Sequence, residues 1–163
     1  GILSACATAN LNINVDVSGD IPTACPSDWM VSVTNTTNTD ARNSGAAYGL
    51  TTIDLGAPGT NILSTTSASL YGNSTGTSMA TPHVAGAIAF MYAVAPLGWI
   101  QQYKLTPGPY SLQVKQKIMQ GVDIKPSMIN NNLLCALKIN HLNIVCIVHK
   151  ISQSTKTLLA RVF

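Results

Sequence analysis

The segment of the sequence best suited to covalent chemistry runs from Gly76 to Gly86 and reads Gly-Thr-Ser-Met-Ala-Thr-Pro-His-Val-Ala-Gly. Its serine, Ser78, directly precedes an apolar run that predicts a buried helix. A helix N-terminus has unpaired backbone N–H groups and the positive end of the helix dipole, which together stabilise an oxyanion. This position favours Ser78 as a nucleophile; the alternative is that Ser78 only caps the helix.

The remaining residues of the segment fit this arrangement. Gly76 allows a substrate to approach closely, Pro82 is tolerated in the first turn of the helix, and Gly86 allows tight packing. Small residues alternate with larger apolar ones as far as Ala93, so the helix is expected to be buried on every side.

The whole segment resembles the serine signature of the subtilisin-like serine proteases (subtilases, peptidase family S8). Residues 7–10 (Ala-Thr-Ala-Asn) are similar to the family's Ala-Ala-Gly-Asn-like stretch, with Ala9 in place of the usual Gly, and residues 55–62 resemble its Ala-Pro-Gly segment. In this family a Ser attacks the scissile carbonyl, a His takes its proton and an Asp orients the His. The resemblance implies that Ser78 is the nucleophile and that the Asn10 amide completes the oxyanion hole. Asn10 could instead open a turn.

The His and Asp of such a triad are not evident in the sequence. The family order is Asp, His, Ser, and no His occurs among the residues that precede Ser78. His83 lies about 140° around the same helix from Ser78, so it is interpreted as a packing residue. His141 and His149 are interpreted as surface or strand residues. Three upstream aspartates are not regarded as substitutes for the family's Asp: Asp16, Asp20 and Asp54.

Two interpretations of function remain open. In the first, the chain is a fragment of a secreted or cell-surface endopeptidase that hydrolyses polypeptide substrates, and a missing N-terminal half of the catalytic domain supplies the Asp and His. A start at Gly1 inside a predicted strand, without an initiator Met, favours this interpretation. In the second, the chain is an inactive pseudoenzyme or an interaction module. A Thr/Asn-rich adhesive domain fits the composition but leaves the serine signature unexplained. We expect the chain by itself to hydrolyse no peptide bonds.

The elements that must position these residues are short buried strands followed by helices. Strands are predicted over 1–8, 29–34, 50–55 and 61–65, loops over 10–26, 35–45 and 72–77, and helices from Ser78 and over 110–120. The predicted fold class is α/β: a partial, three-layer subtilisin-like domain with a mostly parallel sheet and a buried central helix that starts at Ser78. We expect residues 1–126 to be the C-terminal part of a catalytic domain.

The composition changes after Pro126, because residues 128–163 contain no Gly, Pro or Asp. Residues 127–163 are therefore expected to be an atypical tail, either a poorly packed extension or a non-native sequence such as a frameshift product.

Charge and hydropathy exclude several classes of partner. Charged residues make up 9% of the chain, and the eight basic residues of 104–163 are spread singly rather than clustered. No nucleic-acid partner is therefore expected. The longest apolar run, 84–97, has 14 residues and is too short to span a membrane.

No cofactor and no metal site are predicted. The four cysteines lack the C-x-x-C spacing of zinc sites. Cys6 and Cys25 could pair or remain free thiols. Some subtilases bind structural calcium, but the spacing of the aspartates matches no dedicated calcium loop. Asn35-Thr-Thr37 and Asn73-Ser-Thr75 fit the glycosylation pattern, and turn chemistry accounts for both.

Overall fold

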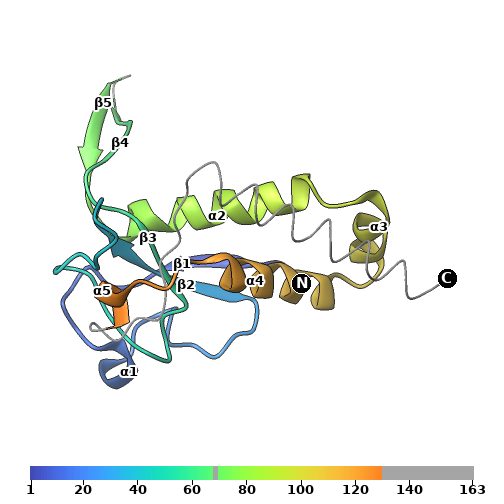
Figure 1. The fold of residues 1–163 in the computed structure, drawn as a ribbon, viewed down its shortest axis with the longest axis horizontal. Helices are drawn as coiled ribbons and strands as arrows, with labels where there is room; N and C mark the ends of the chain where they lie inside the picture. Colours follow the sequence, from blue (N-terminus) through green and yellow to red (C-terminus); the bar gives the residue numbers. More distant parts are fainter. Residues whose placement is uncertain (68–69, 130–163) are drawn as a thin grey trace.

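The computed structural model describes residues 1–67 and 70–129, which form two sheets and five helices. A parallel sheet has the order β1 (Ser4–Ala7), β2 (Met30–Thr36), β3 (Leu55–Pro58), and a separate antiparallel hairpin consists of β4 (Ile62–Thr65) and β5 (Tyr71–Ser74). The hairpin projects away from the rest of the molecule (Figure 1). The helices are α1 (Val15–Ser18), α2 (Thr77–Ala93), α3 (Leu97–Leu105), α4 (Pro107–Gly121) and α5 (Pro126–Ile129).

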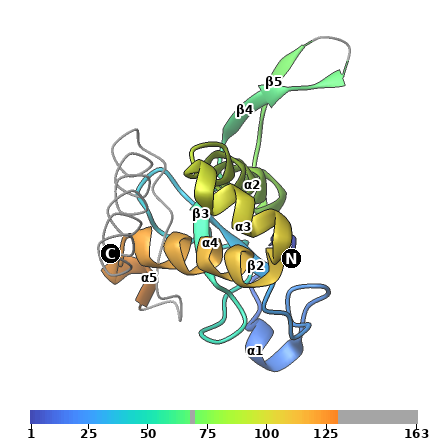
Figure 2. The same ribbon diagram turned by 90° about the vertical axis from the view of Figure 1, so that its right-hand side faces the viewer.

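Side chains of the central strand β2 alternate between two buried layers. Val31 and Val33 join one core cluster with residues of α2 and α4, such as Val84 and Ile118, and all four are buried. Figure 2 shows α2, α3 and α4 gathered on this part of the sheet. The predicted apolar alternation of this strand is thus confirmed, and burial of these side chains is the main stabilising contribution to the layer.

The opposite face of the sheet carries a second core. Thr34 donates a hydrogen bond to the carbonyl of Ala47 at 2.6 Å, which satisfies its buried hydroxyl. Met128 of α5 is fully buried with Val15, Ala47 and Ile53. A Cβ on Gly56 would lie 2.7 Å from the terminal methyl of Met128, so glycine is required for this close packing. The expected three-layer α/β architecture with a parallel sheet is confirmed.

Three expectations about local structure were wrong. The strand expected over 50–55 is β3 at 55–58, because Asp16 accepts the N–H groups of Leu50, Thr51 and Thr52 and holds that segment in a bend. Residues 71–74 form β5 rather than a loop, because they pair with β4. The loop expected to begin at Asn35 starts later, since β2 continues through Thr36 beside β3.

The helical region also differs from expectation. Helix α3 was not expected; its Trp99 and Tyr103 stack at 5.6 Å between ring centroids and pack with Tyr92 and Tyr110. Pro82 lies in the second turn of α2 rather than the first, because the helix begins at Thr77.

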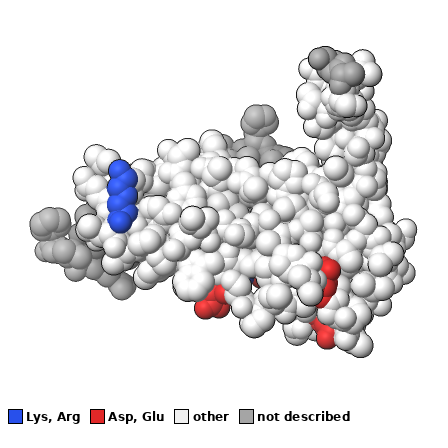
Figure 3. Space-filling model, turned by 180° about the vertical axis from the view of Figure 1, so that it is seen from behind, with Lys and Arg blue, Asp and Glu red and all other residues white. Residues whose placement is uncertain are grey.

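Two properties of the surface bear on partners. In the described residues no single helix is long and apolar enough to cross a membrane, although α2 and α3, bent by 107°, pass that test together by length and composition. Figure 3 shows that the face opposite that of Figure 1 carries few charged side chains.

Candidate active site

The start of α2 is held by a close contact between two glycine-containing segments. The Gly76 N–H donates to the Gly59 carbonyl at 2.9 Å. A Cβ on Gly59 would lie 2.6 Å from the Gly76 carbonyl oxygen and 2.9 Å from the Ala80 Cβ, so a larger residue cannot occupy this position without movement of the backbone. The Ala-Pro-Gly turn therefore positions the first turn of the helix.

Ser78 is the second residue of α2, and its side chain is exposed. The N–H groups of Met79 and Ala80 both donate to the Gly76 carbonyl, at 3.0 and 3.3 Å. Within the described part of the chain, the Ser78 backbone N–H has no acceptor and its hydroxyl has no hydrogen-bond partner. An unpaired N–H at a helix N-terminus, beside an exposed hydroxyl, is an arrangement that can stabilise the oxyanion formed on a carbonyl oxygen that the hydroxyl attacks.

Asn10 lies against this same turn although it is distant in sequence. Its Oδ1 accepts the Thr77 backbone N–H at 2.8 Å and is 3.1 Å from the Thr77 hydroxyl. The hydroxyl also donates to the Thr8 carbonyl at 2.5 Å, and Thr77 is fully buried. Because Thr77 occupies the amide oxygen, the exposed Asn10 side chain presents its NH2 group as a donor.

The backbone before Asn10 is held from both sides. Asp20 accepts the Ala9 N–H at 2.9 Å and the Thr23 hydroxyl at 2.7 Å. The Ala9 carbonyl accepts the Ala47 N–H at 3.0 Å. These bonds position Asn10 through its neighbour Ala9, whereas Thr77 contacts the Asn10 amide directly. Asp20 and Thr77 are therefore positioning residues that were not expected from the sequence. Thr77 could have been identified from its position in the Gly76–Gly86 segment, directly before Ser78.

The Ser78 side of α2 opens onto a hollow of about 440 Å³ between the helix and the β4–β5 hairpin. We call it the Ser78 hollow. Four residues of α2 and seven of the hairpin region line it, and Ile62, Leu63, Met79 and Pro82 supply apolar surface. Space for further atoms therefore exists directly beside the candidate nucleophile.

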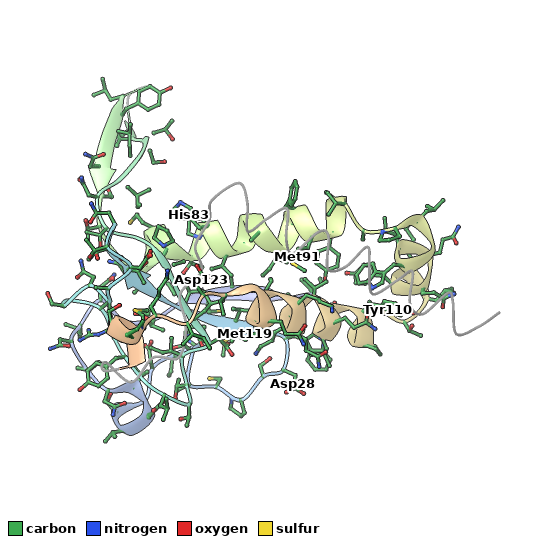
Figure 4. All side chains as sticks on the ribbon, in the orientation of Figure 1. Asp28, His83, Met91, Tyr110, Met119 and Asp123 are labelled. Carbon is green, nitrogen blue, oxygen red and sulfur yellow. The ribbon has the colours of Figure 1, made fainter. Side chains whose placement is uncertain are left out.

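His83 lies on this wall but does not contact Ser78 by a hydrogen bond in the described structure. Its Nδ1 is 2.9 Å from the Met79 carbonyl oxygen, one turn back along α2. Figure 4 shows His83 above α2 near the base of the hairpin. His141 and His149 fall outside the described residues.

The upstream aspartates are occupied elsewhere in the molecule. Asp54 accepts the Ser32 N–H and forms an ion pair with Lys115 at 3.4 Å. Burial raises the pKa of Asp16, but hydrogen bonds from Thr52, Leu50 and Thr51 outweigh burial and lower it to about 2. In the part of the chain that the structure describes, no Asp, Glu, His or Cys side chains gather in a group of three as a metal site would require. Cys6 and Cys25 are both free thiols, and burial raises the pKa of Cys6.

Comparisons with known proteins identify the family and relatives of this chain. The model of the subtilase family matches residues 1–133. An extracellular protease of Xanthomonas campestris is 41% identical over 88 residues, which are 50% of this chain and 15% of that protein. An intracellular serine protease of Paenibacillus polymyxa is 38% identical over 91 residues, which are 56% of this chain and 27% of that protein.

A solved structure is also similar at the level of sequence and fold. The crystal structure of a cold-adapted subtilisin-like serine proteinase superposes on this chain with a TM-score of 0.57 at 27% sequence identity. The match covers 80% of this chain and 41% of the proteinase chain. The chain thus spans well under half the length of these relatives.

Proposed function

Because the chain belongs to the subtilase family, we propose that it forms the nucleophile-bearing part of a serine endopeptidase that hydrolyses peptide bonds in polypeptide substrates. The observation that carries the proposal is the unpaired N–H of Ser78 at the start of α2, beside the outward-facing amide of Asn10. This arrangement is what acyl transfer through a serine requires.

The mechanism follows from these two residues. The Ser78 Oγ attacks the scissile carbonyl carbon, a general base takes the hydroxyl proton, and the carbonyl oxygen becomes an oxyanion. The Ser78 N–H and the Asn10 Nδ2 donate to that oxyanion. Each donor is fixed before the reaction, by the helix for Ser78 and by Thr77 for Asn10, so little reorganisation is needed in the transition state.

We infer that the general base and its Asp come from a further polypeptide segment, the N-terminal half of the catalytic domain. The Ser78 hollow supports this inference, because it leaves room for an imidazole beside the nucleophile. The outward face of α2 supports it too: Ala85, Gly86, Ala89 and Phe90 are exposed on a helix with apolar residues all round. In the described sheet, β1 is an edge strand, which is a further surface for pairing.

The test is complementation. The chain is mixed with a polypeptide that carries the Asp and His motifs of a subtilase N-terminal half, and is treated with a fluorophosphonate probe. We expect labelling and peptide hydrolysis only in the mixture, and neither with Ser78→Ala. Asn10→Ala should keep the labelling but lower kcat by about 100- to 1000-fold, the usual effect of losing one oxyanion donor.

The inactive interpretation, a pseudoenzyme or interaction module, predicts a different outcome. If the two polypeptides bind each other but neither labelling nor hydrolysis follows, the inactive interpretation replaces the proposal of an enzyme. Labelling of the chain alone would instead show that its own residues supply the base.

We further propose that the protein acts outside the cell or at its surface. The relative from Xanthomonas campestris is an extracellular protease and supports this location, whereas the relative from Paenibacillus polymyxa is an intracellular one. Fractionation of the native source with an antibody to the chain distinguishes the two, and recovery only from the cytoplasm would contradict the proposal.

A further inference from the structure

The two Asn-x-Thr sequences occupy very different environments in the folded chain. Asn35 lies in β2 and Asn73 in β5, so both lie in strands rather than turns. The expectation that turn chemistry accounts for both sequences was therefore wrong. Transfer of an oligosaccharide to an Asn-x-Thr site needs an asparagine whose amide nitrogen is accessible in a surface segment. The environments therefore decide which site the folded protein can carry.

Asn35 cannot carry a glycan in this fold. Asn35 is only 1% exposed, and its Oδ1 accepts a hydrogen bond from the Thr60 hydroxyl at 2.9 Å. The same oxygen would lie 2.7 Å from a Cβ placed on Gly59, so the packing around the amide leaves no space for a sugar. A glycan here would also disrupt the Gly59 contact that positions the start of α2.

Asn73 has the opposite surroundings. It is exposed in a two-stranded hairpin that projects from the body of the molecule (Figure 1), where it pairs with Leu63. Its side chain makes no hydrogen bond with another described residue. Its neighbours Gly72 and Ser74 line the Ser78 hollow, whereas Asn73 is not among the lining residues. A glycan on Asn73 would therefore be attached to an exposed side chain that is not part of the lining of the hollow.

We propose that Asn73 is an N-glycosylation site, used when the chain enters a compartment that contains an oligosaccharyltransferase and a lipid-diphosphate-linked oligosaccharide. The Asn73 Nδ2 forms a bond to the anomeric carbon of the sugar, and the bond from that carbon to the lipid diphosphate breaks. The amide gives up one proton to a base, the lipid diphosphate leaves, and no oxidation or reduction occurs. Thr75 completes the recognition sequence, and its hydroxyl accepts the Asn61 N–H at 2.9 Å.

The chain is translated with a cleavable signal sequence, first in the presence of microsomes and then in a yeast that secretes it. Three variants are compared with the parent chain. Asn73→Gln removes the proposed acceptor, and Thr75→Ser keeps both the recognition sequence and the hydroxyl. Thr37→Ala removes the recognition sequence of Asn35 without altering its buried amide.

We expect the parent, Thr75→Ser and Thr37→Ala chains to give a band that an endoglycosidase shifts to faster migration. Asn73→Gln should lose that band in microsomes. Glycopeptide mass spectrometry of the secreted protein should find sugar on Asn73 and none on Asn35. An unchanged band pattern for Asn73→Gln in microsomes, or a glycan on Asn35 in secreted protein, would overturn the proposal.

Discussion

Single residues at the candidate site divide into those that would touch the substrate and those that hold them. Ser78 and Asn10 are exposed, while Thr77 is buried behind them and Asp20 binds the backbone one residue before Asn10. The proposed oxyanion donor on Asn10 thus depends on two side chains that no substrate would contact. Thr77 orients the Asn10 amide by donating to its oxygen, and Asp20 holds the adjacent backbone through the Ala9 N–H. A change at either supporting residue therefore alters geometry rather than chemistry.

Asp20→Asn tests this dependence in the complemented enzyme. An amide oxygen accepts more weakly than a carboxylate, so the Ala9–Asn10 backbone should be less firmly held. We expect kcat to fall by roughly 3- to 30-fold with little change in KM, because about 0.7 to 2 kcal/mol of transition-state stabilisation is lost. Asp28→Asn, a carboxylate elsewhere on the surface, is the control. An equal loss of kcat in both variants would argue against a positioning role.

Asp16 gives the fold a defined dependence on pH. Its pKa in the folded chain is about 2, below the ordinary value of 3.8, because three backbone N–H groups of residues 50–52 donate to its carboxylate. A depressed pKa contributes stability that is fully present above about pH 4 and is lost as the pH falls towards 2.

Urea unfolding of the parent chain and of Asp16→Asn, measured between pH 5 and pH 2, checks this prediction. The free energy of unfolding of the parent should exceed that of the variant at pH 5, and the difference should shrink towards pH 2. A difference that stays constant across this range would show that Asp16 contributes by geometry alone.

At the scale of elements, α2 has two functions that require different residues. Its inner face packs Ala80, Val84 and Ile88 on the sheet, and its N-terminus presents Ser78. Its outer face exposes three small residues and Phe90, and a Cβ on Gly86 would meet no described atom within 4 Å. A glycine inside a helix destabilises the helix by roughly 0.5–1 kcal/mol relative to alanine. No contact within the described chain requires a glycine at position 86.

Gly86→Ala should therefore act in opposite directions on the chain and on its proposed complex. We expect the isolated chain to be stabilised by about 0.5–1 kcal/mol, as measured by urea unfolding. Association with the N-terminal half should weaken, because the added methyl group prevents close approach. Gly98→Ala in α3 is the matched control, since it also adds a methyl group in open space and should stabilise the chain without affecting association. Undiminished association of Gly86→Ala would indicate that this face is not the contact.

At the scale of the whole molecule, the domain boundary expected after residue 126 remains a prediction. Three contacts bear on it. Met128 is fully buried against the second core, and Ser127 donates to the Asp40 carbonyl at 3.0 Å. Lys125 forms an ion pair with Asp40 at 3.2 Å. These contacts indicate that the folded unit extends at least through Ile129.

Two truncated chains locate the boundary. A chain that ends after Ile129 should keep the free energy of unfolding of the parent, whereas one that ends after Pro126 should lose about 2–5 kcal/mol, the usual effect of removing a buried Met side chain. Met128→Ala in the full chain should reproduce that loss. If the chain that ends after Ile129 is much less stable than the parent, residues 130–163 contribute to the fold and the expected atypical tail is wrong.

The sequence by itself determined the family, the parallel α/β architecture and a helix that begins within one residue of the serine. These features depend on residues that are neighbours in the sequence: the Gly76–Gly86 segment and the apolar alternation along β2. It also placed β4 and α4 close to their observed bounds. It misplaced β3, because Asp16 holds residues 50–52 in a bend. It also missed β5 and α3, which form through contacts with other elements: β5 pairs with β4, and α3 packs through an aromatic cluster.

Only the tertiary structure decided how the site is held and which motif is accessible. Asn10 and Thr77 are 67 residues apart in sequence, and their hydrogen bond exists because β1 delivers one to the N-terminus of the helix that carries the other. Two Asn-x-Thr sequences look equivalent along the chain, yet one amide is buried beside Gly59 and the other is exposed on a hairpin. Burial and hydrogen bonding between distant segments depend on the folded chain, whereas motif and periodicity depend on neighbours in sequence.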